Sequence, residues 1–219
     1  MTRRTQASAL VQHLKPQNPE TATGPMATYQ PATVLFVDMI GFTAFCAENY
    51  PATVIEVLRD FLALLSYEVH LHGGTVEKYL GDGLMAVFDG SSKMAKDATG
   101  AVRCALAMQE AIAAWNVKLG RCEANAIQIA IGLHSGRVIV GAVGGDSRKE
   151  IAILGDSVNI ASRVEGKCRC LGTSILATAQ VLEKVCAEGA SDPTSGFENF
   201  GFHELRGRSG YVHLYGVRR

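Results

Sequence analysis

Asp38 and Asp82 are the residues whose types and settings most directly suggest chemistry. Asp38 follows an apolar, β-branched run at residues 33–37, and Gly41 then permits a turn before a helix that begins near Thr43. Asp82 lies in the turn sequence LGDG between two apolar runs. Carboxylate oxygens are ligands that Mg²⁺ prefers, and free backbone N–H groups beside them suit phosphate. The pair predicts a metal and phosphate site, although each aspartate alone is also an ordinary cap or turn residue.

Two further pairs of residues could act on an anion. Asn159 and Arg163 lie four positions apart on a predicted helix, so they share one face of it. An arginine can neutralise charge on a phosphorus in its transition state, and an asparagine can position a sugar oxygen. Arg206 and Arg208, in the turn sequence LRGRSG, could hold phosphates. For both pairs the alternative is an ordinary solvated surface, and the residues alone leave it open.

Hydrophobic periodicity and turn residues predict the elements that must position these side chains. The Asp-Gly pair at 82–83 predicts a hairpin turn, the Ser-Gly pair at 135–136 predicts another, and residues 144–146 read as a flexible loop. We expect strands at 33–37, 75–79, 84–88, 127–133, 138–143, 151–154, 173–177, 197–205 and 211–217, and helices over 93–116, 156–167 and 178–186, with another opened by Pro51 and stopped by Gly73.

The order of the first elements is β-α-β-β-α-β, which is the ferredoxin-like α+β arrangement. In this arrangement the first strand lies beside the strands of the hairpin. We therefore expect Asp38 and Asp82 to meet at one edge of the sheet. The architecture hosts many functions, so by itself it indicates none of them.

Composition indicates a globular domain without an overall charge. Of the 219 residues, 47% are hydrophobic, and Lys plus Arg equals Asp plus Glu at 21 each, so no net field attracts nucleic acid or an anionic membrane. No apolar run approaches the ~20 residues of a transmembrane helix. Six scattered cysteines indicate reduced thiols in a cytoplasmic protein. Four of the six prolines lie within the first 31 residues, which predicts a flexible tail or linker at 1–31 before one domain at 32–219.

Five segments together resemble the catalytic domain of class III adenylyl and guanylyl cyclases. They are LFVDMIGFT at 35–43, VEKYLGDGLMAVF at 76–88, GLHSGRVIVGAVG at 132–144, ILGDSVNIASRVE at 153–165 and ELRGRSG at 204–210. The resemblance covers residues 32–217. Five ordered motifs with compatible spacing are far more specific than any one of them.

The resemblance implies a dimeric enzyme with two sites, each built from both subunits. In such a site Asp38 and Asp82 would hold two Mg²⁺ or Mn²⁺ ions, and the carbonyl of Met39 would assist. The backbone of Phe42 and Thr43 would hold phosphates. The implied reaction is attack of the ribose 3′-hydroxyl on the α-phosphorus, which gives a 3′,5′-cyclic nucleotide and pyrophosphate.

The resemblance also implies that the partner subunit supplies the residues that act on the ribose and the phosphates. Asn159 matches the residue that orients the ribose, and Arg163 matches the arginine that stabilises the transition state. Arg206 matches a lysine that binds the terminal phosphates, and arginine keeps its charge but changes the geometry. Arg148 could be a further phosphate contact.

Three positions bear on the choice of base. Lys78 matches the adenine-recognising lysine of adenylyl cyclases, although on its own it could be an ordinary edge lysine paired with a carboxylate. A lysine donor suits the N1 acceptor of adenine and disfavours the N1–H donor of guanine. The second specificity position falls at Ala152, which cannot accept a hydrogen bond. Adenine would then depend on Lys78 and a backbone carbonyl near Ile153, which predicts weak discrimination against GTP.

The sequence thus predicts a cytoplasmic, homodimeric adenylate cyclase that uses ATP, without a nucleic-acid partner and without a membrane span in this chain. A regulatory domain or partner could be joined through the N-terminal tail. Two alternatives stay open. One is a guanylate or mixed-substrate cyclase, which Lys78 disfavours, and the other is a non-catalytic ferredoxin-like interaction module.

Overall fold

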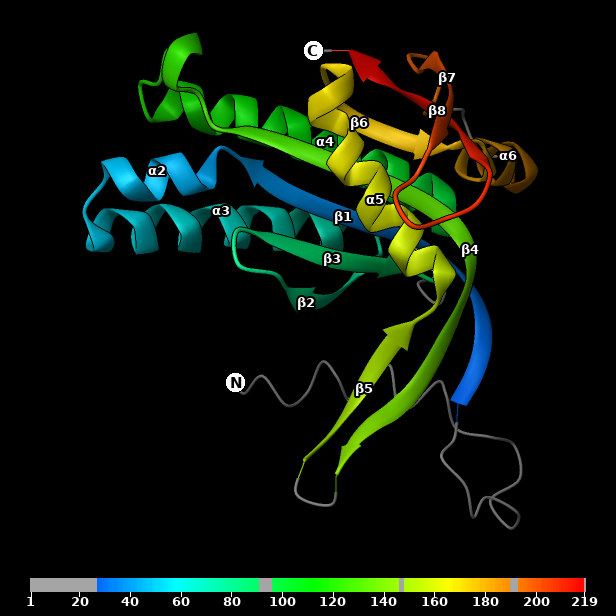
Figure 1. Ribbon diagram of the computed structural model, residues 1–219. Coiled ribbons are helices and arrows are strands. Elements are labelled where there is room, and N and C mark those ends of the chain that lie inside the picture. The colour runs from blue at the N-terminus through cyan, green and yellow to red at the C-terminus, as the bar shows by residue number, and fades with distance from the viewer. Residues whose placement is uncertain (1–26, 91–95, 146–147, 190–192, 219) are drawn as a thin grey trace.

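The computed structural model describes residues 27–90, 96–145, 148–189 and 193–218 (Figure 1). The elements are β1 (Ala27–Ile40), α2 (Phe42–Glu48), α3 (Pro51–Leu71), β2 (Thr75–Tyr79), β3 (Gly83–Phe88), α4 (Asp97–Lys118), a 3-10 turn (Glu123–Asn125), β4 (Gln128–Gly145), β5 (Arg148–Leu154), α5 (Asp156–Leu171), β6 (Thr173–Thr178), α6 (Ala179–Glu188), β7 (Glu198–Glu204) and β8 (Tyr211–Arg218).

The strands form one sheet in the order β2-β3-β1-β4-β6-β8-β7, and β5 pairs with β4 outside this path. β1 lies between β3 and β4 and is antiparallel to both, whereas β4 and β6 are parallel. The first four strands of this order, with α3 and α4 as crossovers, make the ferredoxin-like β-α-β-β-α-β unit. The predicted fold class is therefore confirmed.

Helices cover both faces of the sheet, with α3 and α4 on one face and α5 on the other (Figure 1). Side chains of β1 alternate between the two layers, as the period of a strand requires. Leu35 and Val37 pack with Phe61 of α3 in the larger core, whereas Val34 packs with Met85 and other residues on the α5 side. Because both faces are buried, β1 is held firmly and fixes the place where Asp38 emerges.

The predicted turn at Ser135-Gly136 is wrong, because both residues lie inside the strand β4. The strand runs unbroken from Gln128 to Gly145 and pairs with β5, so the two predicted strands are one and residues 144–145 belong to it; Asp146 lies outside the described residues. Gly136 serves close packing instead, because a Cβ there would lie 2.4 Å from the Oγ of Ser157 in α5. Ser135 Oγ bonds Thr33 Oγ1 at 2.7 Å.

β1 also begins earlier than predicted, at Ala27, so residues 27–31 belong to the sheet and the expected tail boundary at 31 falls inside a strand. Pro31 is tolerated there because β3 pairs with β1 only from Thr33 onward, which leaves β4 as the single neighbour at Pro31. Within the described ranges, no helix is long and apolar enough to cross a membrane.

Candidate active site

Asp38 and Asp82 come together as predicted. Asp38 sits opposite Gly83 in the pairing of β1 with β3, and the Met39 N–H donates to the Asp82 carbonyl at 3.1 Å. Gly83 makes this approach possible, because a Cβ there would lie 2.2 Å from the Val37 carbonyl oxygen and 2.8 Å from Asp38 Oδ1. The hairpin tip is thus bonded directly to the end of β1.

The charge around this pair is poorly balanced. Burial, followed by repulsion from Asp82, raises the pKa of Asp38 to about 6. Burial, followed by the charge of Asp38, likewise raises the pKa of Glu165 on α5 to about 7. Among the described residues, the ion pair of Asp38 is with Arg169, whose Nη2 lies 3.7 Å from Asp38 Oδ2. Three carboxylates therefore share one arginine.

Sequence reasoning missed Glu165 and Arg169. They lie four positions apart on α5, and this spacing is a signal that could have indicated a shared face. The helix packs so tightly on β4 that a Cβ on Gly132 would lie 2.2 Å from the Glu165 nitrogen. In the part of the chain that is described, no group of three or more His, Cys, Asp or Glu residues is placed to hold a metal ion. The aspartate pair is therefore the candidate ligand set.

The predicted phosphate loop joins β1 to the short helix α2. Gly41 has a φ of 80°, a left-handed conformation that favours glycine. The Phe45 N–H donates to the Gly41 carbonyl at 3.0 Å, and no side chain caps the helix start at Phe42 and Thr43. The loop thus presents backbone N–H groups near the carboxyl end of β1.

Arg163 lies beside the turn that carries Arg206. A Cβ on Gly207 would lie 3.6 Å from Arg163 Nη2. The turn is fixed to the start of α5 by an ion pair of 2.9 Å between Arg208 Nη1 and Asp156 Oδ2. Asn159, one turn before Arg163, is exposed, as is Arg206. The structure therefore places Asn159, Arg163 and the turn that carries Arg206 along the first half of α5.

The base-reading candidates also come together, although they are far apart in the sequence. Lys78 lies on β2, and Ala152 and Ile153 lie on β5. The backbone N–H of Ile153 donates to Glu77 Oε1 at 3.3 Å, so the two strands are in direct contact. The backbone of Arg148 begins β5, and its side chain lies outside the described residues.

One chain does not join these groups into a single site. Arg163 and Glu165 are two positions apart on α5, so they point to nearly opposite faces. No hydrogen bond or ion pair among the described residues links Asn159 or Arg163 to Asp38 or Asp82. Each chain thus presents two separate groups of predicted site residues, one acidic and one cationic.

Known structures share this fold. The crystal structure of the adenylyl cyclase CyaB from P. aeruginosa superposes with a TM-score of 0.74 at 26% identity, covering 89% of this chain and 96% of that one. The guanylyl cyclase Cya2 gives a TM-score of 0.69 at 24% identity, covering 87% and 93%, and at this identity shows the fold alone.

Curated relatives have more similar sequences. An adenylate cyclase from Anabaena cylindrica is 33% identical over 183 residues, and adenylate cyclase 1 from Rhizobium meliloti (strain 1021) is 31% identical over 194 residues. These matches cover 81% and 89% of this chain but only 36% and 28% of the relatives, so the chain spans about a third of their length. The family model described as the adenylate and guanylate cyclase catalytic domain matches residues 25–216. The chain therefore belongs to the adenylate and guanylate cyclase catalytic domain family.

Proposed function

We propose that this chain is the catalytic domain of an adenylate cyclase, which converts ATP to 3′,5′-cyclic AMP and pyrophosphate. The observation that carries the proposal is the joined pair Asp38 and Asp82, two carboxylates held together with too little positive charge around them. The curated relatives in Anabaena and Rhizobium are named adenylate cyclases, which supports ATP as the substrate.

The aspartate pair fits a divalent cation. Hard carboxylate oxygens suit Mg²⁺ or Mn²⁺, and the mutual repulsion that raises the pKa of Asp38 would be relieved by positive charge. We propose two ions per site, with the carbonyl of Met39 as a further oxygen. When bound, the ions would lower the pKa of the ribose 3′-hydroxyl and hold the triphosphate.

The other residues would bind and orient the nucleotide. The backbone of Phe42 and Thr43 holds phosphate oxygens, Asn159 orients the ribose, and Arg163 neutralises charge on the α-phosphorus. Arg206 binds the terminal phosphates, with Arg148 as a further contact. In the reaction, a bond forms between the 3′-oxygen and the α-phosphorus, the hydroxyl proton passes to solvent or to a phosphate oxygen of the substrate, and the bond from that phosphorus to pyrophosphate breaks.

A homodimer would complete both sites, because the acidic and cationic groups of predicted site residues in one chain lie on opposite faces of α5. The hairpin of β4 and β5 projects from the body of the molecule beside the start of β1 (Figure 1). Tyr29, Val143 and Leu154 on these strands are exposed by 64%, 45% and 47%. Apolar groups on a projecting hairpin indicate a surface for another protein chain. A cytoplasmic location and a regulatory domain or partner remain predictions.

For the base, Lys78 would donate to N1 of adenine, and the carbonyl of Ile153 would accept from the amine. Ala152 adds no acceptor, so we expect ATP to be preferred over GTP by a small factor, and a mixed-substrate cyclase is the alternative. The loss of one hydrogen bond corresponds to ~1 kcal/mol, or about fivefold.

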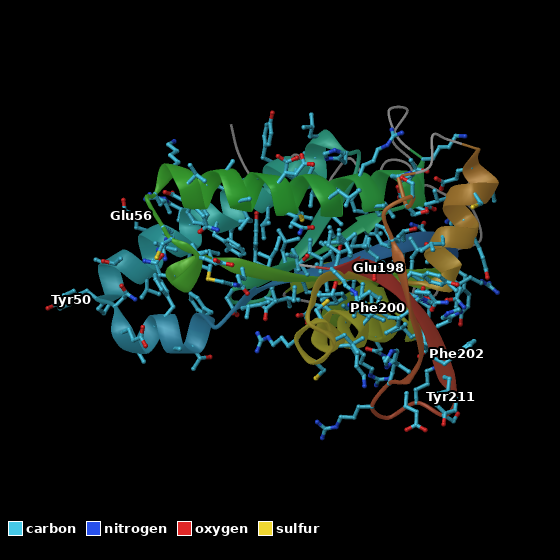
Figure 2. The ribbon with its side chains drawn as sticks, turned by 90° about the horizontal axis from the view of Figure 1, so that it is seen from above. Tyr50, Glu56, Glu198, Phe200, Phe202 and Tyr211 are labelled. Carbon is cyan, nitrogen blue, oxygen red and sulfur yellow. The ribbon has the colours of Figure 1, made fainter. Side chains whose placement is uncertain are left out.

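The alternative of a non-catalytic module is less well supported. Ferredoxin-like modules that bind RNA stack bases on aromatic side chains of their central strands. The labelled aromatic residues Phe202 and Tyr211 lie on the edge ribbon of β7 and β8, and Tyr50 precedes α3 (Figure 2). None of the exposed aromatic residues in the described ranges lies on β3, on β4 or in the part of β1 that pairs with β3.

The test is turnover of ATP with Mg²⁺ or Mn²⁺ by the wild-type protein and Asp38→Asn. We expect cyclic AMP from the wild type and a loss of at least about a hundredfold in Asp38→Asn. Asp60→Asn is a matched control, because Asp60 is exposed and, in the described part of the chain, its ion pair is with its neighbour Arg59. Absence of cyclic nucleotide from the wild type at concentrations that favour dimers, or full activity in Asp38→Asn, would contradict the proposal.

A further inference from the structure

A β-bulge changes the direction of Glu77 on β2. Val76 pairs with Ala86 and Lys78 pairs with Met85, so Glu77 is an extra residue without a partner on β3. At a bulge the strict alternation of side chains is lost, and a side chain can be turned toward the other face. The bulge thus allows the neighbouring side chains of Glu77 and Lys78 to lie on the same side of the sheet.

The hydrogen bond of Glu77 shows which side this is. Met85, opposite Lys78, packs in the same cluster as Ile153 of β5. Glu77 Oε1 accepts the N–H of Ile153 at 3.3 Å. Glu77 therefore lies with Lys78 on the face that β5 covers, next to the three residues expected to read the base.

The surroundings leave Glu77 able to accept another hydrogen bond. The Ile153 N–H points away from β4, and in an antiparallel ladder the carbonyl of the same residue points the same way. Within the described part of the chain, no donor bonds the second oxygen, Oε2. Burial raises the pKa of Glu77, and the Ile153 N–H and the Lys78 charge oppose that shift.

We propose that Glu77 is a specificity-determining residue that accepts a hydrogen bond from the exocyclic amine of adenine, in place of the acceptor that Ala152 lacks. This inference rests on the proposed function. Adenine presents the N1 acceptor beside the 6-amino donor, and Lys78 with Glu77 presents the complementary donor and acceptor. Guanine presents the reverse pattern, so in the same orientation Glu77 would face the O6 acceptor and Lys78 the N1–H donor. Glu77 would thereby restore part of the preference for ATP that Ala152 does not supply.

The test compares ATP with purine riboside triphosphate, which lacks only the 6-amino group. In Glu77→Ala we expect kcat/KM for ATP to fall about tenfold while the value for the analogue changes less than twofold. Glu77→Gln keeps an acceptor oxygen and is expected to retain more of the preference for ATP. Glu56→Ala is the matched control, because Glu56 is exposed on α3 (Figure 2).

The ratio of kcat/KM for ATP to that for the analogue distinguishes a role of Glu77 in base recognition from a purely structural role. If Glu77 only holds β5 in place, Glu77→Ala will lower kcat/KM equally for ATP and for the analogue, which would overturn the proposal. A selective loss of GTP turnover in Glu77→Ala, with ATP unaffected, would overturn the assignment to adenine.

A binding measurement keeps the inference separate from the proposed reaction. The ligands are 3′-deoxy-ATP, which cannot cyclise, and the same molecule without its 6-amino group. If the wild type cyclises nothing but Glu77→Ala weakens only 3′-deoxy-ATP, the proposed function fails and the role of Glu77 stands. If both analogues bind Glu77→Ala as they bind the wild type, the role of Glu77 fails.

Discussion

Two clusters of acidic residues in this molecule, one buried around Asp97 and one half-buried around Asp38, differ in how their charge is balanced. At Asp97, which is 8% exposed, Thr33 Oγ1 donates to Oδ1 at 2.5 Å and Lys184 pairs with Oδ2. At Asp38 the neighbours are Asp82 and Glu165, and Arg169 is 3.7 Å away. Burial raises the pKa of both aspartates. Among the described residues, the second cluster sets three carboxylates against the single ion pair of Asp38 with Arg169.

The difference separates a structural role from a binding role. The start of α4 at Asp97 is joined to α6 by Glu188, whose carboxylate accepts the backbone N–H groups of Ala98 and Thr99 at 2.9 Å each. A cluster that satisfies every oxygen within the chain stabilises the fold. A cluster that concentrates carboxylates without cations reduces stability, and a cation from solution would reverse that cost.

The largest expected effect on stability is at Asp97. In Asp97→Ala, Thr33 loses its acceptor and Lys184 loses its partner, so we expect a loss of about 2–3 kcal/mol in the free energy of unfolding. The figure lies below that of a fully buried pair because Lys184 is 29% exposed. Asp38→Asn is expected to keep or increase stability. Urea denaturation of both variants is the measurement, and equal losses would contradict the contrast between the clusters.

A change of pH is expected to have a smaller effect on the stability of the protein. In the metal-free protein, the pKa of Asp38 is raised from 3.8 to about 6 and that of Glu165 from 4.5 to about 7. Because both folded-state values lie above the unfolded ones, their favourable contribution is complete below pH ~4 and is lost as pH rises to about 7. Melting temperatures in EDTA should therefore fall across this range, and less steeply in Asp38→Asn. An identical slope in the two proteins would show that Asp38 does not titrate there.

Much of the fold could be predicted because local patterns agree with it. Asp-Gly at 82–83 forms the expected hairpin, and Pro51 opens α3 at the expected residue. The prediction of a turn at Ser135-Gly136 was wrong. Small residues that are common in turns also permit the close approach of α5, as they do here at Gly136. Local sequence does not distinguish these two uses of glycine.

Prediction of the candidate site from local sequence has the same limit. Asp38 and Asp82 were predicted to meet because strand order places them at one edge, and the structure brings them together. Glu165 and Arg169 were missed because their role depends on how α5 lies across β4, which no local pattern specifies. The role of Glu77 depends on a bulge in β2, and a bulge of this kind reverses the expected direction of a side chain.

The most direct test of the contrast is a titration of the purified protein with Mn²⁺, with the free ion followed by electron paramagnetic resonance. The account predicts saturable binding in the wild type, its loss in Asp38→Asn, and its retention in Asp97→Asn under conditions where that variant is folded. Equal binding in the wild type and in Asp38→Asn would contradict the claim that the unbalanced carboxylates at the end of β1 form the metal site.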